Sequence, residues 1–292
     1  MHIMSMPKPG LLRHIVVLNT WNPASFTPWY IDGIAVGHMK SPMREAVAQW
    51  PAYFVRNGDR FDFMPGEQSL DTRSEVLDDI VHALVEQGVI RQHINEIYPV
   101  TGHGGRLDLM ARLDRGAAGY FGIKTYGQHL NGYVREGKSL KIWVARRDAS
   151  RVHFPNKLDN IVAGGLPQNL GLQENLIKEC AEEANIDAEL ARQAISVGAI
   201  SYCRENDFGL KPDTLYCYDL ELSPDFEPLN TDGEVAEFML MDPTEVIERV
   251  RDSDDFKINC NLVFIDFFIR HGLIGPDQPE YLELIEGLHA TL

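Results

Sequence analysis

The segment from Gly164 to Ile186 constrains this chain more than any other stretch, because a glycine pair there precedes an amphipathic helical pattern. At about 100° per residue, one side of the predicted helix is apolar. Its residues are Leu172, Leu176, Ile177, Cys180, Ala181 and Ala184. Glu179, Glu182 and Glu183 share an arc beside that side, where like charges repel by roughly 0.2–0.5 kcal/mol per pair. Mg²⁺ prefers carboxylate oxygens and bridges them to phosphates. The pattern therefore indicates a metal-binding helix or, without a ligand, a solvated acidic face.

The charge of the chain is unevenly distributed. Residues 1–138 carry 14 Lys and Arg and 14 Asp and Glu, whereas residues 139–292 carry 13 and 29, which accounts for the net charge of −16. A surface this acidic repels a nucleic-acid backbone, so we expect no binding to a nucleic-acid polymer. It also repels a free diphosphate, so action on a phosphate ester would require a metal ion in between.

Length, hydropathy and cysteine content limit the class of protein. A chain of 292 residues can form two domains with their own cores. No apolar run approaches the length of a membrane span, and no basic region followed by an apolar stretch marks the N-terminus. The four cysteines, Cys180, Cys203, Cys217 and Cys260, lack CxxC spacing. We therefore expect reduced, buried thiols in a cytoplasmic protein that does not bind membranes.

The hydrophobic pattern changes near Tyr120 and predicts a division into residues 1–118 and 119–292. The first part is predicted to contain a loosely held lead-in over residues 1–20, a short strand and turn over 28–40, and helices over 69–88 and 107–117. The second part is predicted to contain strands over 120–134, 140–146, 199–204, 214–222 and 236–241, and helices over 256–271 and 280–292. Strands on either side of the 172–184 helix, with a later helix opposite, suggest an α+β fold with a mixed sheet between helices.

The acidic helix and the glycines before it closely resemble the Nudix box. That motif is Gly, five residues, Glu, seven residues, Arg-Glu, an apolar residue, any residue, Glu-Glu, any residue, Gly and an apolar residue. The matching positions here are Gly164, Glu179, Cys180, Glu182, Glu183 and Ile186. Leu170, Lys178 and Asn185 stand where the motif has Glu, Arg and Gly. The resemblance implies a Nudix α/β/α sandwich preceded by a smaller α+β accessory domain.

Further segments resemble one branch of that family, the two-domain Nudix hydrolases related to the Nudix part of the fungal thiamine pyrophosphokinase fusion. The segments are 121–134, 158–160, 163–167, 232–235, 256–260 and 269–272. This resemblance implies a Mg²⁺- or Mn²⁺-dependent diphosphatase that converts thiamine diphosphate, or its oxidised analogues, to the monophosphate and phosphate. Two alternatives are a Nudix pyrophosphatase for a nucleoside diphosphate derivative such as ADP-ribose, and a Nudix-fold module that binds without turnover. The box itself does not separate the substrates. The oligomeric state is open, with a homodimer as one candidate.

Metal and catalytic roles follow for four acids. Glu182 and Glu183 are the first choices as metal ligands, and Glu179 serves as a ligand or as the base that orients water. Glu234 is predicted to be a remote metal-binding carboxylate; the alternative is a turn acid beside Gly233.

Predicted contacts to the diphosphate substrate are Gly164, Gly165, Arg146, Lys157, His129 and Asn131, and Arg147 is a further candidate for contact with phosphate. Basic residues at strand ends are more often solvated, and a single histidine on a half-buried strand is more often a core group. The neutral N-terminal domain is expected to shape substrate choice, although it could instead simply cover an apolar face of the sheet.

Overall fold

A computed structural model describes residues 10–66, 68–137 and 139–289. Its central element is a seven-stranded mixed sheet in the order β11-β12-β7-β8-β13, to which β10 adds beside β7 and β9 beside β8. Within the described residues, β12 and β7 pair in parallel, and the other strand pairs of this sheet are antiparallel. The strands are β7 Thr125–Glu136, β8 Ser139–Arg147, β9 Leu158–Asn160, β10 Val162–Gly165, β11 Ile195–Glu205, β12 Leu210–Glu221 and β13 Val235–Met241.

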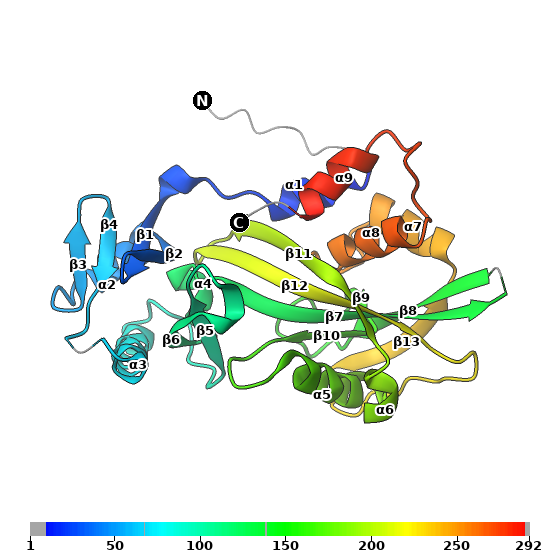
Figure 1. Ribbon diagram of the computed structural model, residues 1–292, viewed down its shortest axis with the longest axis horizontal. Coiled ribbons are helices and arrows are strands. Elements are labelled where there is room, and N and C mark those ends of the chain that lie inside the picture. The colour runs from blue at the N-terminus through cyan, green and yellow to red at the C-terminus, as the bar shows by residue number, and fades with distance from the viewer. Residues whose placement is uncertain (1–9, 67, 138, 290–292) are drawn as a thin grey trace.

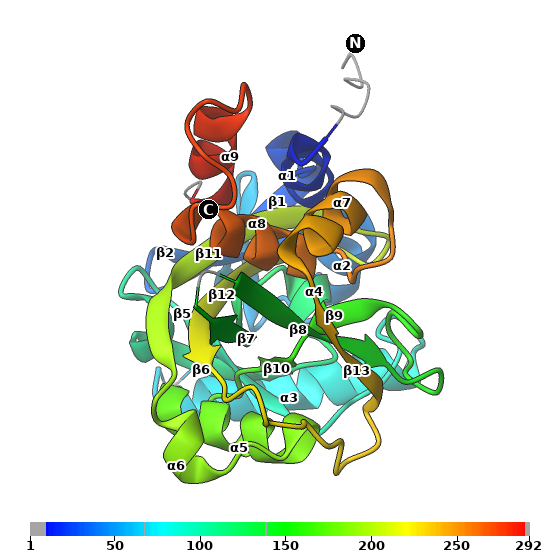
Figure 2. The same cartoon turned by 90° about the vertical axis from the view of Figure 1, so that its right-hand side faces the viewer.

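Helices cover both faces of this sheet (Figures 1 and 2). On one face, α5 (Leu172–Ala184) and the short α6 (Ala188–Ala191) enclose a core with Leu130, Val162 and Leu220. On the other face lie α7 (Pro243–Asp252), α8 (Cys260–Arg270) and α9 (Tyr281–Leu288). The predicted α+β class, with a mixed sheet between helices, is confirmed. Within the described ranges, every helix is too short or too polar to pass through a lipid bilayer.

The beginning of the chain is held more firmly than the sequence predicted. Residues 1–9 of the expected lead-in lie outside the described residues, but α1 (Leu12–Leu18) follows and buries Leu12 and Leu18 in the same core as α8 and α9. The Nε2 atom of His14 lies 2.6 Å from the carbonyl oxygen of Val250, which ties α1 to the end of α7. The expectation of a loose lead-in was therefore wrong from Leu12 onward. Leu12, Ile15 and Leu18 are spaced three residues apart, so in a helix they lie on one face, which packs against this core.

The rest of the N-terminal part contains a four-stranded sheet in the order β2-β1-β4-β3 (Figure 1). These strands are β1 Phe26–Ile31, β2 Ile34–Lys40, β3 Phe54–Asn57 and β4 Arg60–Phe63, and α2 (Ser41–Val47) packs beside them. Trp29, Phe54, Phe63 and Phe121 meet in one buried aromatic cluster. The predicted helix over 69–88 is confirmed as α3 (Leu70–Glu86), which Ser69 caps through a bond from the Thr72 N–H.

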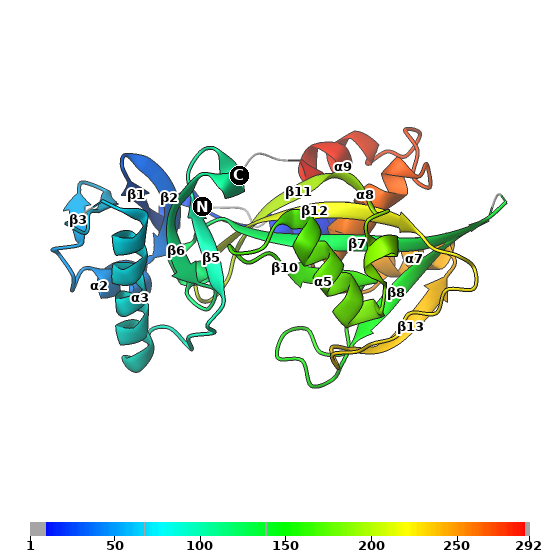
Figure 3. The same ribbon diagram turned by 60° about the horizontal axis from the view of Figure 1, so that its bottom comes forward.

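A two-stranded hairpin of β5 (Ile97–Thr101) and β6 (Leu109–Asp114) lies between α3 and the seven-stranded sheet (Figure 3). The helix predicted over 107–117 was wrong. Met110 and Leu113 have a spacing that suits a helix, but pairing of this segment with β5 gives its backbone groups partners in a sheet. The α-helix nearest to this segment is the short α4 (Ala118–Phe121), which begins after β6 has ended.

The division into residues 1–118 and 119–292 stays a proposal. The N-terminal core extends to Phe121 and Ile123, a few residues past the proposed boundary. Conversely, α1 belongs to the core of the C-terminal part. Each part therefore contributes a short segment to the core of the other, α1 from the first and residues 121–123 from the second.

Candidate active site

The glycine pair and the acidic helix are joined by one short loop. β10 pairs with β7 so that Gly164 lies opposite Gln128 and Gly165 opposite Gly127. The amide of Asn175, fully buried in α5, donates to the carbonyl oxygen of Gly165 at 3.0 Å and to the side chain of Gln128 at 2.8 Å. These bonds fix the first turn of α5 against the strand that precedes it.

At its other end, α5 stops at Asn185, which has a φ of 53° and takes the left-handed cap position. Asn185 can replace the Gly of the motif here because asparagine tolerates the left-handed conformation.

Both glycines are required by neighbours that approach the backbone closely. A β-carbon on Gly164 would lie 2.5 Å from the carboxyl carbon of Glu179. A β-carbon on Gly165 would clash with the hydroxyl oxygen of Tyr98. No real β-carbon makes such short contacts, so neither position can carry a side chain without displacing its neighbour. The glycine pair therefore lets Glu179 and Tyr98 converge on one stretch of backbone.

The three box carboxylates lie in different environments. Glu183 is buried, and its carboxylate accepts a hydrogen bond from the Ala163 N–H at 2.8 Å. Burial raises the pKa of Glu183 well above its usual range, and the negative charges of Asp159 and Glu179 raise it further. Burial also raises the pKa of Glu179, although the neighbouring Lys178 opposes this shift. Glu182 is half exposed.

Lys178 supplies the cation that the like-charged face needs in this structure. Its ammonium lies 3.2 Å from Glu179 and 2.6 Å from Glu182. In the described part of the chain, Glu183 forms no ion pair within 4.0 Å; the Ala163 N–H and the more distant charge of Lys257 stabilise its negative charge. Glu183 therefore retains the strongest demand for a further cation.

Glu234 lies in the same small pocket as Glu183, although 51 positions separate them in the sequence. Arg147, Asp159 and Asn160 line that pocket as well. The Glu234 carboxylate pairs with Arg151 at 2.5 Å, and its charge contributes to the raised pKa of Glu179. Glu234 is therefore near two box acids, and its role as a metal ligand remains a proposal.

Asp159 is a buried acid to which the sequence analysis assigned no role. It forms ion pairs with Arg147 and Lys257, each at 3.1 Å. Burial alone would raise the pKa of Asp159. The charges of Lys257 and Arg147 and the hydrogen bond from Cys260 outweigh burial, so the net shift of the pKa is downward. Its only sequence signal was the Leu158–Asn160 segment of the family branch. Asp159 thus keeps a negative charge at the base of the pocket.

The predicted phosphate contacts are engaged elsewhere. Arg146 pairs with Glu237 at 2.8 Å, and the Lys157 ammonium donates to the carbonyl oxygen of Asp254 at 2.5 Å. Side chains on a strand alternate between faces, and it is the next residue, Arg147, that lines the pocket. No substrate contact of Arg146 or Lys157 is supported by this arrangement.

His129 and Asn131 are buried on the α8 side of β7, where His129 Nδ1 and the Asn131 amide are hydrogen-bonded to neighbours. His129 Nδ1 lies 2.8 Å from the Asn160 side-chain oxygen, while Asn131 donates to Asp219 at 3.0 Å and accepts from Asn160 at 2.8 Å. Burial lowers the pKa of His129 to about 4. In this conformation they reach the pocket only through Asn160, so direct contact with substrate is not supported.

The N-terminal part contributes side chains to the site that the sequence analysis missed. Tyr98 from β5 approaches Gly165, and the half-exposed Arg115 guanidinium lies 5.6 Å from the Tyr98 ring centroid. The charge of Arg115 is attracted to Glu179 as well as to Glu96, with which it pairs at 2.6 Å.

Backbone contacts attach the hairpin to the loop before α5. The Gln168 N–H donates to the carbonyl of Ile97 at 2.8 Å, and Arg106 donates to the carbonyl oxygens of Pro167 and Leu170. The N-terminal part therefore borders the carboxylates directly. No short-range pattern signals this, because 64 positions separate Tyr98 from Val162, where β10 begins.

Comparison with known proteins gives a family model and close relatives. A model described as "Domain of unknown function (DUF4743)" matches residues 10–125. Nudix hydrolase 20, chloroplastic, of Arabidopsis thaliana is 40% identical over 273 residues, covering 90% of this chain and 72% of that protein. Nudix hydrolase 24, chloroplastic, of the same plant is 42% identical over 218 residues, covering 75% of this chain and 60% of that protein.

Among solved structures, a Deinococcus radiodurans protein matches 60% of this chain and 100% of its own, at 16% identity and a TM-score of 0.43.

Proposed function

The chain belongs to the Nudix hydrolase family, whose members act on pyrophosphate bonds, and we propose that it hydrolyses thiamine diphosphate or its oxidised analogues. The products are the monophosphate and phosphate. The support for this substrate is the resemblance of segments on both sides of the box to the two-domain branch, together with the site described above. The proposed metal is Mg²⁺, with Mn²⁺ as a substitute.

The observation that carries the proposal is that Glu183 and Glu234 line one pocket, while Glu179, whose pKa the charge of Glu234 helps to raise, packs against Gly164. All are hard oxygen donors, and the raised pKa values of Glu179 and Glu183 reflect carboxylates whose charge lacks full compensation. This donor set fits Mg²⁺. When bound, Mg²⁺ would neutralise charge on the diphosphate and favour deprotonation of a water molecule.

The protein residues would then divide the remaining work. Glu183, fixed by the Ala163 N–H, would act as a ligand in a set position. Glu179, held behind Gly164, would act as a ligand or would accept the proton of the attacking water. Glu182 is exposed at the rim and would exchange Lys178 for the metal ion.

Arg115 replaces Arg146 and Lys157 as the proposed phosphate contact. It lies beside Gly165 and carries a guanidinium that can bind two phosphate oxygens at once. The neighbouring aromatic ring of Tyr98 and the stacked pair of Tyr126 and Tyr216 favour an uncharged or cationic ring at the other end of the substrate. Thiamine carries such a cationic ring.

A single panel of compounds tests the substrate. The full-length protein is assayed with Mg²⁺ on thiamine diphosphate, an oxidised thiamine diphosphate, ADP-ribose and inorganic diphosphate, and products are identified by mass. The proposal requires the highest kcat/KM for a thiamine compound, with thiamine monophosphate or its oxidised form as product. A preference for ADP-ribose would assign the nucleoside alternative, and binding without turnover of any compound would assign the non-catalytic one.

A further inference from the structure

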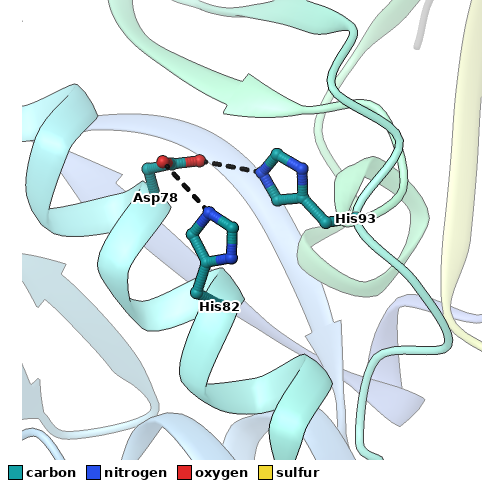
Figure 4. Close-up of side chains that lie close together, drawn as sticks. All are labelled: Asp78, His82 and His93. Atoms are coloured by element: carbon teal, nitrogen blue, oxygen red, sulfur yellow. Dashed lines mark hydrogen bonds and ion pairs between the residues drawn. The ribbon is translucent and has the colours of Figure 1, made fainter.

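Two histidines and an aspartate meet in the N-terminal part of the chain, on α3 and the segment that follows it (Figure 4). Asp78 and His82 stand one turn apart on α3, and His93 comes from the connection between α3 and β5. Asp78 lies 3.0 Å from His93 Nε2 through one carboxylate oxygen and 3.5 Å from His82 Nε2 through the other. We call these three residues the His–Asp cluster.

The cluster has the dimensions of a metal site. Zn²⁺ binds imidazole nitrogen and carboxylate oxygen at about 2.0–2.2 Å, so two ligand atoms of a tetrahedral site stand about 3.3 Å apart. The two Asp78 contacts lie on either side of that value. One ligand atom from each residue can be chosen so that all three lie within 4.8 Å of one another. Two histidines with one carboxylate form a donor set that suits a first-row transition metal rather than Mg²⁺.

The hydrogen bonding of His93 also favours metal binding. Its ring stacks on that of His82 at a centroid distance of 4.3 Å, so the exposed His82 side chain would rotate for both Nε2 atoms to face one ion. The Nδ1 atom of His93 lies 3.3 Å from a carboxylate oxygen of Asp114, which is fully buried. The Asn95 N–H lies 3.3 Å from the same Nδ1 but only 2.8 Å from Asp114, so we assign that N–H to the carboxylate. Nδ1–H can then donate to Asp114, which leaves the lone pair of Nε2 facing Asp78. Carboxylates behind metal-bound histidines have this arrangement and strengthen the ligand.

Charge and access are compatible with a divalent ion. The negative charges of Asp78 and Asp114 together match two positive charges. The side chain of His82 is 56% exposed and that of Asp78 is 46% exposed, whereas that of His93 is 13% exposed. Solvent can therefore reach one side of the cluster, where water would complete the coordination. The second group of metal-binding residue types in the described ranges, His129, Asp159 and Cys260, is buried and already bound to Lys257 and Asn160.

We propose that Asp78, His82 and His93 bind one Zn²⁺ ion, at a site distinct from the carboxylates of the Nudix box. The ion would join α3 to the segment that leads into β5. Since β5 carries Tyr98 to Gly165, zinc would stabilise the hairpin that borders the candidate active site without taking part in hydrolysis.

The test measures zinc binding to the full-length protein, free of any affinity tag, by isothermal titration calorimetry. Excess Mg²⁺ is present so that it occupies the box carboxylates. The wild type is expected to bind one Zn²⁺, and His82→Ala to bind it more than about 10-fold more weakly. His82 is exposed, so its removal should not disturb folding. Asp79→Asn, on the next position of α3, and His103→Ala are matched exposed controls that should bind zinc as the wild type does.

Two further readouts separate a built site from weak surface binding. Co²⁺ in place of Zn²⁺ should give visible absorption typical of tetrahedral coordination in the wild type and not in His82→Ala. Zinc should raise the melting temperature of the wild type and Asp79→Asn, with little effect on His82→Ala. Equal zinc affinity in the wild type and His82→Ala, or no zinc binding by the wild type, would overturn the proposal. The cluster would then be a hydrogen-bonded pair of histidines sharing Asp78.

Discussion

Gly164 and Glu179 occupy adjoining space: the carboxyl carbon of Glu179 lies 2.5 Å from where a β-carbon on Gly164 would stand. The Glu179 carboxylate thus fills the space that a side chain at position 164 would occupy. The absence of a side chain at position 164 determines where the carboxylate of Glu179 can lie. The geometry of the proposed metal ligands consequently depends on the strand that precedes the helix.

Gly164→Ala should displace Glu179 and lower kcat by at least about 10-fold, because a misplaced ligand of this kind sharply reduces turnover. Because the crowded atoms belong to the end of a flexible side chain that can move aside, the free energy of unfolding should fall by no more than about 1 kcal/mol. Gly171→Ala is the matched control, since no atom lies within 4 Å of its new β-carbon and its φ of −73° suits alanine. Equal kcat in both variants would contradict this coupling of glycine and carboxylate.

Glu183→Gln should abolish most turnover while raising stability in the absence of metal. Glutamine keeps an oxygen that can accept from the Ala163 N–H, and it removes a buried charge near Asp159 and Glu179. The free energy of unfolding without metal should therefore rise, because burial and the neighbouring acids disfavour the charged form of Glu183. Kinetic assays and thermal melts in EDTA measure the two effects. A variant that is fully active and depends on metal as before would show that the acids form a solvated helix face and not a metal site.

Removal of divalent metal should stop hydrolysis. The expected result is loss of turnover in excess EDTA and its recovery on addition of Mg²⁺ or Mn²⁺, because the box carboxylates repel a diphosphate unless a cation lies between. Zinc bound at the His–Asp cluster should not restore turnover by itself. Full activity in EDTA would exclude the metal mechanism.

Arg115→Ala should raise KM about 10-fold with a smaller change in kcat, because loss of one charge-assisted hydrogen bond to phosphate weakens binding by roughly 1.5–3 kcal/mol. Arg112→Ala is the control: Arg112 lies on β6, three positions before Arg115, but pairs with Asp71 at 2.8 Å. Comparable KM values in the two variants would assign Arg115 to its ion pair with Glu96 alone.

His129 should make the protein less stable in mild acid. Its pKa is about 4 in the folded chain and about 6.5 when unfolded, so between these values the unfolded state binds more protons. Stability is therefore present above pH 6.5 and is lost as the pH falls toward 4, by up to about 3 kcal/mol.

Unfolding by denaturant across this pH range should show a smaller loss in His129→Gln than in the wild type. His103→Gln, in an exposed turn, should follow the wild type. Parallel curves for all three proteins would show that His129 titrates normally.

The sequence predicted the elements that local patterns specify. The acidic helix appears as α5. The strands predicted over 140–146, 199–204 and 236–241 lie within observed strands, and the one over 214–222 extends one residue past the end of β12. The segment from Leu107 to Ala117 was misassigned because its partner strand decides its structure. The box acids came from one motif, whereas Tyr98 and Arg115 reach the site through tertiary packing alone. Asp159 likewise becomes significant only where Lys257 and Arg147 surround it.

The position of α1 has a consequence for the order of folding. Residues 26–123 can assemble their own aromatic core while later parts of the chain are still being synthesised. In contrast, α1 packs against α8 and α9, more than 240 positions further along. β11 also packs against α1, but the apolar face of α1 stays partly uncovered until α8 and α9 have left the ribosome. Closure of the larger core is consequently a late, long-range step, and a chain arrested before α8 would expose Leu12 and Leu18 to aggregation or chaperone binding.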